Sequence, residues 1–136
     1  MIVNHTHRAK GGIISSAVAV LVGYLVLAVP ITGKFLLIRY LLPDVLPAPG
    51  EDVFPSTGWL LAMLASDIAI MIAAGYVTAG LAPRTPVGHT VTLGVITVIL
   101  GLTWMFVFWG WMPLWYQVVL VSLAIPAAAT GGSLRV

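Results

Sequence analysis

Hydrophobic residues fall into four long runs, which are separated by short segments rich in polar residues and proline. The runs cover residues 12–30, 58–81, 90–111 and 114–130. At about 1.5 Å per residue, each run is long enough to cross a bilayer as a helix, the last only just. The pattern predicts an all-α integral membrane protein, in which four transmembrane helices form one bundle and one domain over residues 1–136.

The breaks between the runs differ in character. Residues 43–57 form an acidic loop whose four prolines exclude a regular helix, and Ser56 or Thr57 is suited to cap the helix that follows. After the first run, apolar residues resume at 35–42, so Pro30 either kinks one long helix or ends it before a short interfacial helix.

Composition supports lipid as the solvent of these helices. The chain is 60% hydrophobic and 7% charged, which is far from the balance of soluble domains. A net charge of +2 without a basic run argues against nucleic acid as a partner. The lack of cysteine excludes disulfides and thiolate metal sites.

Lysine and arginine predict the orientation. With four spans, Arg8, Lys10, Arg84 and Arg135 fall on one side of the membrane, while Lys34 and Arg39 fall on the other. The positive-inside rule then places both termini in the cytoplasm and the acidic loop, residues 43–57, on the outer side of the membrane.

Asp67 is the candidate functional residue. It lies near the middle of the second run and is the ionisable residue that we expect at mid-depth in the bilayer. A carboxyl group at that depth is costly, so it needs a polar partner, a proton or a functional reason. The alternatives are an internal hydrogen bond, a contact with another subunit, and a proton or ion pathway.

The helical wheel of the second run has two faces. Small residues gather on one of them, and we expect this face to contact the rest of the bundle. Asp67 lies nearly opposite, beside Thr78, and the expected hydrogen-bond donors from other helices are Thr97, Thr103 or Tyr24. The small-residue stripe consists of Ala62, Ala65, Ser66, Ala69, Ala73 and Gly80.

Small residues also gather at the cytoplasmic ends of the spans, and bulky ones at the outer ends. Gly12, Ser15 and Ser16 belong to the first group. The pattern predicts a bundle that is tight inside and splayed outside. The outer aromatic residues form either an interfacial belt or a crevice that holds a lipid, quinone, pigment or partner helix. The crevice candidates are Trp59, Trp104, Phe108, Trp111 and Trp115.

For the remaining basic residues and histidines we expect interfacial positions and no ligand binding. Lys34 and Arg39 can reach lipid headgroups at the outer boundary. His5 and His7 lack nearby ligand partners, so no metal site is expected. His89 is expected to lie at the cytoplasmic boundary.

The hairpin at residues 74–95 (AGYVTAGLAPRTPVGHTVTLGV) resembles hairpins in small, functionally uncharacterised four-helix bacterial integral membrane proteins. The resemblance covers a small-residue helix end, an arginine loop between prolines, and a histidine that opens the next helix. It implies a location in the bacterial inner membrane and carries no activity with it.

Catalysis in a membrane needs convergent polar groups, and the sequence offers one carboxyl and no catalytic or nucleotide-binding motif. We therefore expect no enzyme and no required cofactor, although a bound lipid, quinone or pigment is compatible with the aromatic residues. The leading hypothesis is a non-enzymatic accessory subunit of a larger membrane complex. The alternatives are a homo-oligomeric transporter or channel that uses Asp67, and a lipid- or pigment-binding protein.

Overall fold

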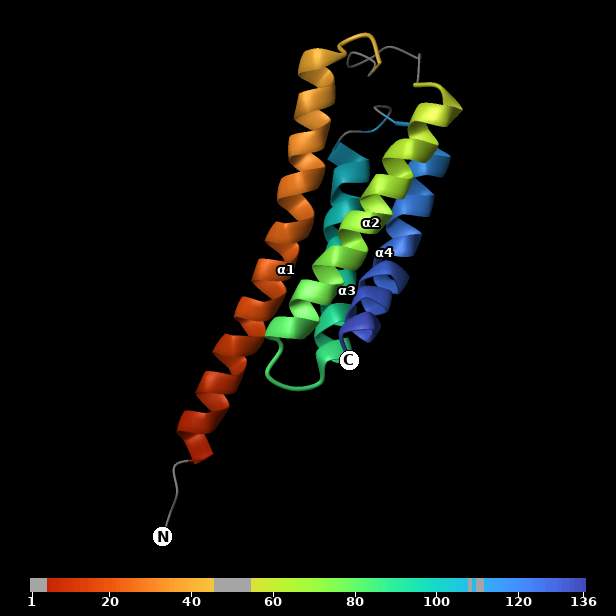
Figure 1. The fold of residues 1–136 in the computed structure, drawn as a ribbon. Helices are drawn as coiled ribbons and strands as arrows, with labels where there is room; N and C mark the ends of the chain where they lie inside the picture. The colour runs from red at the N-terminus through yellow and green to blue at the C-terminus, as the bar shows by residue number, and fades with distance from the viewer. Residues whose placement is uncertain (1–4, 46–54, 108, 110–111) are drawn as a thin grey trace.

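The computed structural model describes residues 5–45, 55–107, 109 and 112–136. These residues form four α-helices, each long and apolar enough to cross a membrane, as expected for a multi-pass membrane protein (Figure 1). The helices are α1 (His5–Leu41), α2 (Thr57–Leu81), α3 (Pro86–Val107) and α4 (Leu114–Arg135). The all-α, four-helix prediction is thus confirmed.

Helix α1 continues through Pro30, so of the two alternatives for this residue the structure has the one long helix, and the first span does not end at residue 30. The helix has 37 residues and a length of about 55 Å. Proline is tolerated there because the apolar residues on both sides favour one helix, and Pro30 is exposed. Helix α3 begins earlier than the predicted span, at Pro86, whereas α4 begins at Leu114 as predicted and extends further, to Arg135.

Helix α2 begins as predicted. The Ser56 side chain accepts a hydrogen bond from the backbone N–H of Trp59, at 3.4 Å, and thereby satisfies one of the donors at the helix start.

Helices α2, α3 and α4 pack closely at the end of the bundle that holds the α2–α3 loop and the C-terminus, which we call the α2–α3 end (Figure 1). Gly75 lies against the Ala128 carbonyl, and Gly131 lies against the Ile72 carbonyl. A Cβ atom on either glycine would collide with backbone atoms of the facing helix. The predicted close packing at this end therefore holds for these helices.

Helix α1 does not share that packing. It contacts α2 and, less extensively, α3, and its N-terminal end lies well away from the other helices (Figure 1). The small residues near its start were expected in the tight contact, but Ser15 is exposed and Ser16 lines an open cavity. For α1 the prediction is wrong.

The assignment of the two faces of α2 is reversed. Asp67 and Thr78 are buried with the larger residues Met63 and Met71, whereas most of the small-residue stripe is exposed. The buried polar groups explain the reversal, because a carboxyl needs partners that lipid cannot offer. We call the exposed residues Ala62, Ala65, Ala69, Ala73 and Gly80 the small-residue face of α2.

Candidate functional site: a buried cluster of polar side chains

Asp67 lies inside the bundle near the middle of α2 and is 3% exposed. Its neighbours on the buried face of α2 are Met63, Leu64 and Met71. In such apolar surroundings a carboxylate requires hydrogen bonds and a counter-charge to remain ionised.

Lys34 of α1 supplies the counter-charge. Its ammonium group forms an ion pair with Oδ1 of Asp67. The same nitrogen lies 2.7 Å from Oγ of Ser66 and 3.3 Å from the backbone carbonyl of Met63. An ammonium group has three N–H donors, and these three acceptors can use all of them. The Lys34 side chain is 23% exposed, so the ion pair is only partly buried on the lysine side.

Tyr116 of α4 completes the cluster. Its phenolic hydroxyl donates to Oδ2 of Asp67 at 2.8 Å. The buried residue lies in the first turn of α4, where its backbone N–H donates to the Pro113 carbonyl at 3.1 Å. Each carboxylate oxygen of Asp67 has one donor, one from α1 and one from α4.

The polar cluster, defined as Lys34, Ser66, Asp67 and Tyr116, joins three helices. Ser66 donates its own hydroxyl to the Met63 carbonyl at 2.8 Å. Among the described residues, every buried polar side-chain atom has a partner. The cluster is neutral overall when the pair is ionised, and its hydrogen bonds are internal. Such an arrangement fixes helix positions and leaves Asp67 without a free oxygen for a cation.

The sequence analysis missed both partners of Asp67. Of the expected donors, Thr97 bonds the Leu93 carbonyl and Thr103 bonds the Ile99 carbonyl, while Tyr24 lines a separate cavity. Thr78 is fully buried and bonds the Ala74 carbonyl. The three threonines therefore satisfy their hydroxyls within their own helices, which is common in membrane helices.

The predicted headgroup contact of Lys34 is corrected as well. We expected it at lipid headgroups, but its ammonium is directed to Asp67. The available signal was its place seven residues inside the end of α1, about 10 Å deep, where an internal counter-ion is more favourable than lipid. Arg39 lies one turn nearer the helix end and is partly buried, and its headgroup contact stays a prediction.

The outer aromatic crevice also stays a prediction. Phe108 and Trp111 lie outside the described residues. Trp59, Trp104 and Trp115 are exposed, with Trp104 at 59%. Where the structure is described, no group of three or more histidine, aspartate or glutamate residues is placed to hold a metal ion. The side chains of His5 and His7 are not among those described.

Comparisons of the chain with protein-family models, with curated proteins and with solved structures find no match.

Proposed function

We propose that the chain is a non-enzymatic accessory subunit of a larger membrane protein complex, which docks through the small-residue face of α2 onto a transmembrane helix of an unlike chain. The observation that carries the proposal is the exposure of this face, which lies opposite the buried face that holds Asp67.

The spacing of the small residues suits helix docking. Ala65, Ala69 and Ala73 repeat every four residues, a pattern that lets helix backbones approach closely in membranes. From Ala62 to Gly80 the face extends about 27 Å, which is nearly the thickness of the hydrocarbon core. It offers a recess along Ala62, Ala65, Ala69 and Ala73, whereas toward Gly80 the exposed Tyr76 ring and the Arg135 guanidinium stacked on it occupy the same face. We propose an unlike helix as the occupant, and the experiment below separates it from a second copy of the chain, because small-residue stripes also join identical helices.

The polar cluster supports a structural role for Asp67. Because the carboxylate is bonded by Lys34 and Tyr116, it holds α2 against α1 and α4. Helix α2 is thereby presented in a fixed position, and a preformed docking helix loses less entropy on binding. The same bonds oppose a transport role, in which the carboxylate would need to be free to bind a cation or proton.

For the orientation, we propose a bacterial inner membrane with both termini in the cytoplasm. The Lys34 ammonium is paired with Asp67, so it contributes less to the positive-inside comparison. Four basic residues then lie on the proposed inner side, against Arg39 on the proposed outer side. The chain has no cysteine, so single-cysteine variants can report the orientation. A reagent that does not cross membranes should label Asp44→Cys in intact cells, and Thr85→Cys only after lysis. The reverse pattern would contradict the orientation.

The docking proposal is tested by mild detergent extraction from the native membrane and native mass spectrometry. The wild-type chain should carry an unlike chain, and Ala69→Leu should lose it because the larger side chain fills the recess. Thr103→Leu, at an exposed position of α3, is the matched control and should keep the partner.

Each other result contradicts the docking proposal. A homo-oligomer that dissociates with Ala69→Leu would favour the transporter or channel alternative, in which Asp67→Asn abolishes flux. A monomer with a bound lipid, quinone or pigment, lost in Trp104→Ala, would favour the binding-protein alternative.

A further inference from the structure

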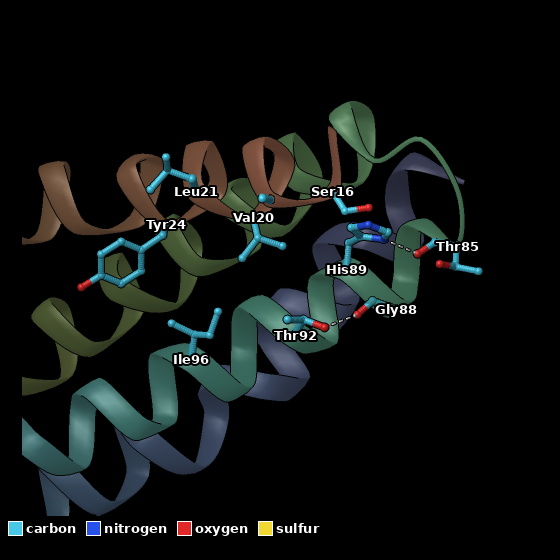
Figure 2. Close-up of a pocket in the computed structure, with 10 residues that line it drawn as sticks. Ser16, Val20, Leu21, Tyr24, Thr85, Gly88, His89, Thr92 and Ile96 are labelled. Carbon is cyan, nitrogen blue, oxygen red and sulfur yellow. Dashed lines mark hydrogen bonds between the residues drawn. The ribbon is translucent and has the colours of Figure 1, made fainter. Parts of the chain in front are cut away.

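An open cavity of about 720 Å³ lies between α1 and α3 at the α2–α3 end. Its volume is within the range of small-molecule sites. The cavity is separate from the polar cluster and from the small-residue face of α2. Figure 2 shows the residues that line it, which come from α1, from α3 and from the loop before α3, and include Ser16, Val20, Tyr24, Thr85, His89 and Ile96.

One end of the cavity is polar. Nδ1 of His89 lies 2.9 Å from the Thr85 carbonyl, and because a carbonyl only accepts, Nδ1 carries the hydrogen. In the neutral imidazole, Nε2 is then an acceptor. Ser16 lies beside the His89 ring on the facing helix (Figure 2).

Thr85 at this end has a left-handed backbone, with φ of 42°. This conformation is unfavourable for a β-branched residue and is found mainly where surrounding contacts enforce it. Its carbonyl accepts from both the backbone N–H and the ring of His89. The strained residue therefore holds His89 at the cavity.

The rest of the cavity is mainly apolar. Val20, Leu21 and Ile96 line its middle, and Tyr24 lies at the end away from His89 (Figure 2). From Ser16 to Tyr24, α1 advances about 12 Å, which gives room for part of an acyl chain. The cavity is thus polar at the α2–α3 end, and its lining becomes apolar toward the middle of the bundle.

One positive charge adjoins the polar end. Arg84 is exposed and directly precedes Thr85. The acidic residues that the structure describes are distant from it, since Asp44 follows the other end of α1 and Asp67 belongs to the polar cluster. This charge favours an anionic ligand.

We propose that this cavity binds an acidic phospholipid whose headgroup carries hydroxyl groups, of the phosphatidylglycerol type. The phosphate accepts hydrogen bonds from Ser16 and Arg84, and a headgroup hydroxyl donates to Nε2 of His89. One acyl chain lies along Val20 and Ile96. The site is independent of the proposed docking through α2.

The test is native mass spectrometry of the purified full-length chain, after incubation with lipids of identical acyl chains. Phosphatidylglycerol, phosphatidic acid and phosphatidylcholine serve as probes. Phosphatidylglycerol should be retained most, and Arg84→Gln should reduce its retention about fivefold, which corresponds to one headgroup charge contact. Ser16→Leu, which fills the cavity, should reduce it further. Thr103→Leu is the control and should retain lipid as the wild type does.

His89→Phe separates the roles of charge and hydroxyl. It should remove the preference for phosphatidylglycerol over phosphatidic acid, while the preference for acidic lipids over phosphatidylcholine persists. Equal retention of the three lipids by the wild-type chain would overturn the proposal. So would a phosphatidylglycerol preference that survives both Arg84→Gln and Ser16→Leu. Because Arg84 is an exposed loop residue, its variant is informative even where Ser16→Leu does not fold.

Discussion

At the scale of single residues, the bundle contains a lysine and an aspartate that satisfy one another. Burying either charge alone would be costly, whereas the pair together with the hydroxyls of Ser66 and Tyr116 is neutral and fully hydrogen-bonded. The loss of one partner should therefore be more harmful than the loss of both.

This asymmetry gives the first stability prediction. Asp67→Asn leaves the Lys34 ammonium without its counter-charge and should lower the free energy of unfolding in detergent by about 2 kcal/mol, since Lys34 is partly exposed. The double variant Lys34→Met with Asp67→Leu should recover most of the loss, because apolar replacement of a buried pair is often neutral. Asp44→Asn, at an exposed position, is the control and should have no effect. Thermal unfolding measures all three, and a double variant no more stable than Asp67→Asn would show that the charges are uncoupled.

At the scale of helices, close backbone approach joins α2 to α4. Without a hydrophobic driving force between helices in lipid, packing of small residues supplies much of the attraction. Gly75 of α2 and Gly131 of α4 allow this approach, because each lies against a backbone carbonyl of the other helix.

Gly131→Ala should therefore force α2 and α4 apart. The added Cβ would meet the Ile72 carbonyl, a backbone atom that cannot turn aside, and overpacking of this kind costs about 1–3 kcal/mol. Gly33→Ala on α1 is the matched control, because its Cβ would have open space. It should leave the unfolding temperature unchanged or raise it, since alanine favours helix more than glycine does. Equal effects of the two substitutions would refute the close contact.

The sequence was sufficient to predict the helices but not their facing surfaces. Length and apolar composition identify four spans, because few other structures satisfy the backbone in lipid. The wheel of α2 also separates Asp67 from the five residues of the small-residue face, although Ser66, the sixth residue of the predicted stripe, joins Asp67 in the polar cluster. It cannot say which face is internal, since small residues suit a contact inside the chain and a contact with a partner equally well.

The partner of Asp67 required long-range information. Lys34 lies 33 residues away and Tyr116 lies 49 residues away, and no local pattern links them. An intramembrane lysine needs a counter-ion, and Asp67 is the acidic residue within a membrane span that can supply it. The tilt of α1, and with it the cavity beside His89, depends on packing that single-helix patterns do not contain.

At the scale of the whole molecule, different groups of residues hold the helices together and form the outward surface. The polar cluster holds α1, α2 and α4 together, and the glycine contacts hold α2 against α4. The small-residue face of α2, from Ala62 to Ala73, then remains as an outward surface that presents little side-chain bulk to lipid. We attribute this surface to docking with another membrane helix, which is the central claim.

Site-specific photocrosslinking in the native membrane tests that claim most directly. A photoreactive amino acid at position 69 on the small-residue face should yield an adduct with one unlike protein, while the same residue at position 103 on α3 should react with lipid. Mass spectrometry of the adducts identifies the partner. An adduct with a second copy of the chain, or reaction with lipid alone at position 69, would contradict the account.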